Sequence, residues 1–183
     1  MEPERFEFRQ TIEGLLLGAL EARSDAELLA KLRNAGLDLT VNLQPAYPAA
    51  VFFKFVGIAA RHRFPGQPEA DAMREVGRLA VRRGLEATLL GRAVLEAAKL
   101  IGVRRALKRF GMVMKNGNNY IEGKVTELSP NALELELGPL VGPRSYYEGV
   151  LEECPRILGA RDISVTHVRD EGENAVWHVK WVD

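Results

Sequence analysis

The chain has 183 residues, of which 46% are hydrophobic and 27% are charged, and its formal net charge is zero. These values are ordinary for a soluble globular domain with one core. The single cysteine, Cys154, excludes an internal disulfide and indicates a reducing compartment. The N-terminus lacks the pattern of a signal peptide, and no apolar run approaches the roughly 20 residues of a bilayer span. We therefore expect one cytoplasmic domain over residues 1–183.

The charge is unevenly distributed along the chain. Residues 1–118 carry 19 Lys+Arg against 13 Asp+Glu, whereas residues 119–183 carry 6 against 12. An anionic partner bound to the first part explains this asymmetry. Pairing between the two parts explains it without a partner, and we favour this second explanation.

The beginning of the chain predicts helices. The apolar run in residues 6–22 suits a buried strand or a helix start equally. Ser24-Asp25-Ala26-Glu27 then has the form of a capping box with Ser24 as the N-cap, and Gly36 supplies a left-handed stop. Pro48 begins a further helix, because its missing N–H does no harm in the first turn. The apolar residues of this helix lie three or four apart and predict one buried face, made by Val51, Phe52, Phe55, Val56 and Ala59.

The middle of the chain, from Pro68 to about Phe110, is nearly all helical in character. Three glycines, Gly84, Gly91 and Gly102, mark breaks or close helix contacts. The pattern predicts three helices near 68–83, 85–101 and 103–111.

The spacing of apolar residues changes from helical to alternating near Asn116-Gly117-Asn118-Asn119. Leu133, Leu135 and Leu137 alternate with glutamates, as in a half-buried strand that a turn joins to the segment before it. Pro143 begins an amphipathic helix, which Pro155 should kink or end. Two more alternating segments follow this helix.

These patterns predict an α+β fold in which N-terminal helices pack on a C-terminal four-stranded antiparallel sheet with a crossover helix. Residues 1–115 would form the helical part. Residues 116–183 would form a β-hairpin, a helix and a second β-hairpin.

The sequence offers no convincing metal or catalytic site. His62 lies between two arginines and is predicted in solvent, whereas His167 and His178 fall on adjacent strands, with His178 out of phase with Trp177. A structural zinc normally needs four ligands with compact spacing. Cys154 has a negatively charged neighbour, which opposes thiolate formation, so a core position is favoured. We therefore expect no metal, no cofactor and no enzymatic activity, since no nucleophile–base pair is recognisable.

Two segments are candidates for binding. Residues 74–115 carry 11 Lys+Arg against three Glu, and Arg104, Arg105, Lys108 and Arg109 line one helix face that suits an anion or a phosphate. This stretch shows no aromatic residues interleaved with the basic ones for base stacking, so a solvated face paired with the acidic part is favoured. The Asn- and Gly-rich segment 115–120 fits a tight helix-to-strand connection. Its place between helices and sheet leaves a role in ligand binding open.

Several short motifs occur in a specific order over nearly the whole chain. They are Gly36-Leu37-Asp38-Leu39, Ala46-Tyr47-Pro48, Gly91-Arg92, Gly117-Asn118-Asn119-Tyr120, and Tyr147-Glu148-Gly149-Val150-Leu151-Glu152 followed by Gly159-Ala160. With this order the chain resembles a myxobacterial paralogous family of uncharacterised proteins. The order of elements also resembles a wider fold group, which includes haem nitric-oxide-binding domains, four-vinyl-reductase-type domains and transport-particle subunits.

The resemblance to this fold group implies an apolar ligand, such as haem or an acyl chain, held between helices and sheet. A haem-binding member would carry a proximal histidine on the helix before the sheet and a Tyr-x-Ser-x-Arg run near the crossover helix. Residues 85–115 contain no histidine and residues 133–142 contain no such run. The cysteine group of the vinyl-reductase type is also absent, so we expect no haem.

The leading hypothesis is a non-catalytic binding or signalling module that holds a small apolar ligand or a protein partner, with a homodimer as a further option. The candidate ligand-binding residues are the aromatics of the interior, Phe52, Phe55, Tyr120, Tyr146, Tyr147 and Trp177. One alternative is a nucleic-acid or anion binder that uses Arg104, Arg105, Lys108 and Arg109. The other alternative is an enzyme of unknown reaction.

Overall fold

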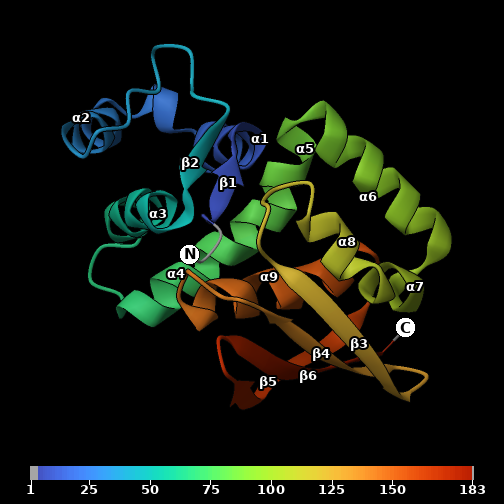
Figure 1. The fold of residues 1–183 in the computed structure, drawn as a ribbon. Helices are drawn as coiled ribbons and strands as arrows, with labels where there is room; N and C mark the ends of the chain where they lie inside the picture. The colour runs from blue at the N-terminus through green and yellow to red at the C-terminus, as the bar shows by residue number, and fades with distance from the viewer. Residues whose placement is uncertain (1–3, 183) are drawn as a thin grey trace.

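The computed structural model describes residues 4–182, which form helices packed on an antiparallel sheet (Figure 1). The α+β fold class is confirmed. The elements before the sheet are β1 (Phe6–Phe8), α1 (Arg9–Ile12), the π-helix η1 (Glu13–Ala19), the 3₁₀ turn η2 (Ala22–Ser24), α2 (Ala26–Asn34), β2 (Ala46–Pro48), α3 (Ala49–Arg63), α4 (Glu69–Leu79), the π-helix η3 (Ala80–Gly84), α5 (Leu85–Ala87), α6 (Leu89–Ile101), α7 (Val103–Lys108) and α8 (Phe110–Met114). The remaining elements are β3 (Glu122–Ser129), β4 (Ala132–Gly138), α9 (Arg144–Ile157), β5 (Arg161–Glu171) and β6 (Asn174–Val182).

The C-terminal sheet has the predicted topology. Its strand order is β3-β4-β6-β5, every neighbouring pair is antiparallel, and α9 connects the two hairpins. Leu133, Leu135 and Leu137 are fully buried on the face of β4 that meets the helices. Trp177 is fully buried next to them on β6, while His178 points to the other face and lies 3.1 Å from Glu134. The alternation of side chains therefore placed the core face correctly.

The crossover helix α9 packs closely against α4 (Figure 1). Gly77 and Gly149 lie at this crossing, where an added Cβ would overlap the backbone carbonyl of the opposite helix. Arginines of α4 and η3 pair with glutamates of α9: Arg74 with Glu148, Arg78 with Glu152 at 2.6 Å, and Arg82 with Glu153 at 2.8 Å. The basic and acidic parts of the chain therefore pair with each other.

The apolar run Leu15-Leu16-Leu17 lies in the π-helix η1, and the short strand β1 precedes it. β1 pairs antiparallel with β2, and the chain then continues as α1 and η1. The loop before β3 extends this small sheet, because the Phe8 N–H donates to the Gly117 carbonyl at 2.8 Å and the Phe6 N–H donates to the Asn119 side chain at 2.7 Å. The part expected to be helical therefore also contains two short strands, and the Asn- and Gly-rich loop fixes one of them.

Several local expectations were wrong. Asp25, not Ser24, is the N-cap of α2: its backbone is extended and its Oδ1 accepts from the Leu28 N–H at 2.9 Å. Aspartate caps a helix as well as serine does, and with Leu28 three residues after Asp25 the helix α2 has a single N-cap and no capping box. Val51 is 38% exposed at the solvent edge of α3. α9 continues past Pro155 to Ile157, so the proline does not end the helix at once, and the alternative of a kink at Pro155 stays a prediction.

His62 is not a solvated side chain. Its imidazole is 13% exposed, and its Nε2 lies 2.8 Å from Oδ2 of Asp25, the N-cap of α2. The histidine therefore ties the end of α3 to the start of α2. Within residues 4–182, no helix is long and apolar enough to cross a membrane.

Candidate functional site

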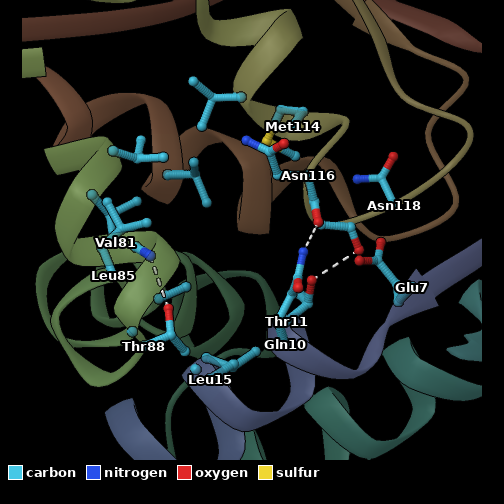
Figure 2. Close-up of a pocket in the computed structure, with 18 of the residues that line it drawn as sticks. Glu7, Gln10, Thr11, Leu15, Val81, Leu85, Thr88, Met114, Asn116 and Asn118 are labelled. Atoms are coloured by element: carbon cyan, nitrogen blue, oxygen red, sulfur yellow. Dashed lines mark hydrogen bonds between the residues drawn. The ribbon is translucent and has the colours of Figure 1, made fainter. Parts of the chain in front are cut away.

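A cavity of about 190 Å³ lies between the N-terminal helices and α9 (Figure 2). Side chains from distant parts of the chain form its wall. They are Glu7, Gln10, Thr11, Gly14, Leu15, Phe52, Phe53, Ala80, Val81, Gly84, Leu85, Thr88, Leu90, Gly91, Val94, Phe110, Val113, Met114, Asn116, Gly117, Asn118, Tyr146, Tyr147, Val150 and Cys154. Leu90 and Asn116 are also exposed, so the cavity reaches solvent between the start of α6 and the loop before β3.

The wall of the cavity has an apolar side and a polar side. Figure 2 shows Val81 and Leu85 on one side, and Glu7, Gln10 and Asn116 on the other. Most of the lining is apolar, as is usual for small-molecule sites in proteins, and a few convergent polar groups then orient a ligand. The arrangement therefore suits an apolar body with one polar group.

Two π-helices form part of the apolar side. Leu15 comes from η1, and Ala80 and Val81 come from η3. The two π-helices touch where Gly14 meets the backbone of Gly84. π-Helical turns are rare and occur mainly at functional sites, because they change the direction of side chains. Here both present residues to the same cavity.

The polar side contains a buried carboxyl group. Glu7 is 4% exposed, and the Tyr120 hydroxyl donates to its Oε1 at 2.5 Å. Burial raises the pKa of Glu7 from 4.5 to about 8, an effect that the Tyr120 hydrogen bond only partly offsets. Burial also raises the pKa of Tyr120 and of Tyr147, whose hydroxyl lies next to that of Tyr120. Glu7 is therefore mostly protonated at neutral pH.

The loop before β3 forms the rest of the polar side. The Gln10 amide donates to the Asn116 carbonyl, and the Thr11 hydroxyl donates to the Gly117 carbonyl at 2.9 Å (Figure 2). The Asn118 side chain is buried and accepts from the Ile121 N–H at 2.8 Å. The Asn- and Gly-rich composition thus serves a tight connection and also shapes the cavity.

The six aromatic residues proposed from sequence occupy two kinds of position. Phe52, Tyr146 and Tyr147 line the cavity. Phe55, Tyr120 and Trp177 are buried in the core and are not among the lining residues. Sequence reasoning missed the contributions of Glu7, Gln10 and Thr11, because a charged N-terminal segment carries no pattern that predicts burial. Glu7 is buried because β1 pairs with β2 and with the loop before β3, and no local sequence pattern predicts this pairing.

The basic residues considered as an anion site do not converge. Arg104 and Lys108 both reach Glu127 of β3, at 2.7 and 2.9 Å, and they lower the pKa of that carboxyl to about 2. Arg105 and Arg109 are exposed on the surface of α7 and just beyond it. Glu127 therefore pairs with two of the four cations, and Arg105 and Arg109 alone provide little local positive charge for an anion.

We predict that the protein shows no salt-steep binding to nucleic acid near physiological ionic strength. Phosphate binding releases counterions, so a true interface of this kind would lose affinity steeply with added salt. Titration of labelled single- and double-stranded oligonucleotides at two salt concentrations measures this. Tight binding that Arg104→Ala with Arg105→Ala abolishes would instead establish the basic face as the site.

Cys154 lines the cavity, and burial raises the pKa of its thiol to about 12, so the thiol stays protonated at neutral pH. Within residues 4–182, no three His, Cys, Asp or Glu side chains converge in a way that would hold a metal ion.

The fold is similar to that of H-NOX domains. One structure, concerned with the molecular mechanism of H-NOX activation, is 12% identical and covers 97% of each chain with a TM-score of 0.73. An oxygen-binding H-NOX domain related to soluble guanylate cyclases, in its oxygen complex, is 14% identical and covers 95% of this chain and 92% of its own, with a TM-score of 0.69. A third, from work on haem distortion in the H-NOX family, is 14% identical and covers 93% and 95%, with a TM-score of 0.66.

At these identities the likeness shows a shared fold. The sequence itself belongs to the family described as protein of unknown function DUF2378, whose model matches residues 5–182. No curated protein matches the chain significantly.

The donor atoms around the cavity do not fit haem. Haem iron in proteins is held by histidine, by a cysteine or tyrosine anion, or by methionine opposite histidine. No histidine lines this cavity, and burial keeps the Cys154 thiol and the Tyr146 and Tyr147 hydroxyls protonated by raising their pKa values. Met114 supplies a thioether without a histidine to accompany it. Haem therefore has no suitable axial ligand among the lining residues.

Proposed function

We propose that this protein is a non-catalytic binding or signalling module that holds a small, largely apolar ligand between its helices and its crossover helix. The observation that carries this proposal is the cavity of about 190 Å³ with an apolar wall and one polar end. The likeness to H-NOX domains supports the same class of role. From the sequence we also propose a cytoplasmic location and a myxobacterial source.

The size of the cavity limits the ligand. An apolar cavity of roughly 150 Å³ in another protein stays dry and binds benzene. The cavity here is somewhat larger, so it suits a molecule a little bigger than benzene. Contact with apolar side chains supplies most of the affinity, at about 25 cal/mol for each Å² removed from water.

The helix α6 gives a route from the ligand to a protein partner. Gly91 and Val94 of α6 line the cavity, whereas Leu89 and Leu100 are 81% and 89% exposed. Leu89 and Leu100 are separated by three helical turns, so they lie on one face. A ligand that moves α6 would therefore move these two exposed leucines, which are available for contact with another protein.

We propose that the module acts without catalysis. Covalent or acid–base chemistry needs a nucleophile within reach of a base, and the base in turn needs a group that orients it. The lining residues offer a protonated thiol and one protonated carboxyl group, on different elements. Neither has a partner that would activate it.

We predict that filling the cavity abolishes binding of a small apolar probe. Ethylbenzene should bind the unaltered protein with a negative heat-capacity change, the mark of apolar burial. The substitution Ala80→Leu adds three carbon atoms at the cavity wall and should weaken binding at least tenfold. Isothermal titration calorimetry at several temperatures measures both quantities.

The matched control is Ala93→Leu. Ala93 lies on an exposed part of α6 and does not line the cavity, so the same change there should leave binding unaltered. Equal affinity for ethylbenzene in Ala80→Leu and in the unaltered protein would show that the cavity is not the ligand site.

A further inference from the structure

We propose that the ligand in this cavity is a neutral molecule whose acceptor oxygen receives a hydrogen bond from the carboxyl group of Glu7. This inference rests on the proposed function and names the chemical class of the ligand. It assigns to Glu7 the role of the polar group that orients an otherwise apolar molecule.

The geometry of Glu7 leaves one of its oxygens available. Tyr120 donates its hydroxyl hydrogen to Oε1, which fixes Oε1 as an acceptor. Oε2 has no hydrogen-bond partner among residues 4–182, and Glu7 lines the cavity. A ligand group placed beside Oε2 can therefore form a hydrogen bond with it.

Among residues 4–182, no positive charge compensates Glu7. The Tyr120 hydroxyl hydrogen-bonds Glu7 and lowers its pKa. In turn, the charge of ionised Glu7 raises the pKa values of Tyr120, Tyr146 and Tyr147. Arg9, two residues along the chain, pairs with Glu13 at 3.2 Å instead. Tyr47, opposite Glu7 in β2, uses its hydroxyl to accept from the Gln44 N–H.

The carboxyl group is therefore neutral, and its proton lies on the free oxygen. A buried carboxyl without a cation is protonated at neutral pH, in agreement with its pKa of about 8. Since Oε1 accepts from Tyr120, the carboxyl proton resides on Oε2. Oε2–H is then a hydrogen-bond donor on a residue that lines the cavity, and a carbonyl, ether or hydroxyl oxygen can accept from it.

Other ligand classes fit this end of the cavity less well. A carboxylate ligand brings a second acid group and no cation to balance it, which disfavours its charged form. An ammonium ligand needs Glu7 to ionise and both charges to leave water, and that desolvation offsets much of their attraction. A neutral oxygen acceptor satisfies the donor without burying a charge.

Three probes of nearly equal shape test this inference: acetophenone has a carbonyl oxygen, ethylbenzene has no polar group, and 1-phenylethylamine carries an ammonium group. At pH 6.5 we expect calorimetry to show acetophenone binding at least tenfold more tightly than ethylbenzene. Glu7→Gln keeps an N–H donor of similar shape and should retain this preference. Glu7→Met has no donor, so it should bind acetophenone and ethylbenzene about equally.

The pH dependence gives a second readout. Ionisation removes the donor, so the preference for acetophenone should fall as the pH rises from 7 to 9.5 and stay constant in Glu7→Gln. The Gln variant keeps the contact with Tyr120 and therefore tests the inference even if Glu7→Met does not fold. Tighter binding of 1-phenylethylamine, or an unchanged preference in Glu7→Met, would overturn the inference while leaving the binding function intact. Failure of all three probes would instead overturn the proposed function, and the inference with it.

Discussion

Replacing Glu7 with glutamine is expected to stabilise the protein by several kcal/mol at pH 9. Burial raises the pKa of Glu7 from 4.5 to about 8. Each unit of difference between folded and unfolded pKa corresponds to about 1.4 kcal/mol, so ionisation costs the fold on the order of 3–5 kcal/mol. Glutamine has nearly the same shape, keeps a carbonyl acceptor for Tyr120 and never ionises.

Stability falls with rising pH because the folded protein holds the proton of Glu7 to a higher pH than the unfolded chain does. Between pH 4.5 and 8 the unfolded chain has released the proton of Glu7 and the folded chain still holds it. The contribution of this group to stability is therefore complete below pH 4.5, falls as the pH rises to 8, and changes little above that. Asp38 and Glu127 have pKa values lowered to about 2, so their contributions change at much lower pH.

Chemical denaturation at pH 5, 7 and 9 measures this effect. The free energies of unfolding of the unaltered protein and of Glu7→Gln should be close at pH 5 and diverge as the pH rises. Glu122→Gln is the control, because the side chain of Glu122 is 77% exposed. Parallel pH profiles for Glu7→Gln and the unaltered protein would show that Glu7 ionises freely in the folded state.

The sheet and the crossover helix were predictable from sequence because burial there follows a simple period. Leu133, Leu135 and Leu137 face the helices, and the glutamates between them face away from the core. A strand with one buried face must alternate, so the pattern determines both the strand and its orientation. The amphipathic α9 follows from the same reasoning at a period of 3.6 residues.

The cavity was only half predictable, because its wall is assembled from contacts between distant segments. Tyr146 and Tyr147 were found as interior aromatics, and aromatic composition alone does not separate a cavity wall from a filled core. Trp177 fills the core instead. Nothing in the local sequence of Glu7 predicts burial, since glutamate is almost always exposed. Its position depends on β1 pairing with β2 and with the loop before β3.

The partners of the charged surface residues were also not predictable from the sequence. The surplus of arginines in the helical part suggested an anion site, and the structure pairs many of them with glutamates of α9 and β3. The partners from α4 and η3 on one side and α9 on the other are separated by 74 and 71 residues in two of these pairs. Sequence composition gives the number of charges in each part, whereas their partners depend on the packing of α4 against α9.

Gly149→Ala is expected to lower the free energy of unfolding by about 3 kcal/mol. A Cβ atom at Gly149 would overlap the carbonyl oxygen of Arg74, which belongs to the backbone of α4 and has no freedom to rotate away. The helices must then separate, and overpacking of this kind costs about 1–3 kcal/mol or more. The ion pair between Arg78 and Glu152 spans the same crossing and would lengthen with it.

The matched control is Gly57→Ala in α3. Gly57 is also a buried helical glycine, and an added Cβ there would approach only the end of the flexible Arg61 side chain, at 3.4 Å. Alanine is the better helix former by up to about 1 kcal/mol, so this variant should be slightly more stable than the unaltered protein. The two substitutions thus make the same chemical change with opposite expected signs, and chemical denaturation measures both.

The same experiment connects the helix crossing to ligand binding. Tyr146, Tyr147 and Val150 of α9 line the cavity, so a shift of α9 away from α4 changes the shape of the cavity wall. Gly149→Ala should therefore weaken ethylbenzene binding even under conditions where the variant remains folded, and Gly57→Ala should not. A Gly149→Ala protein as stable as the unaltered one would mean that α4 and α9 do not approach as closely as the structure shows.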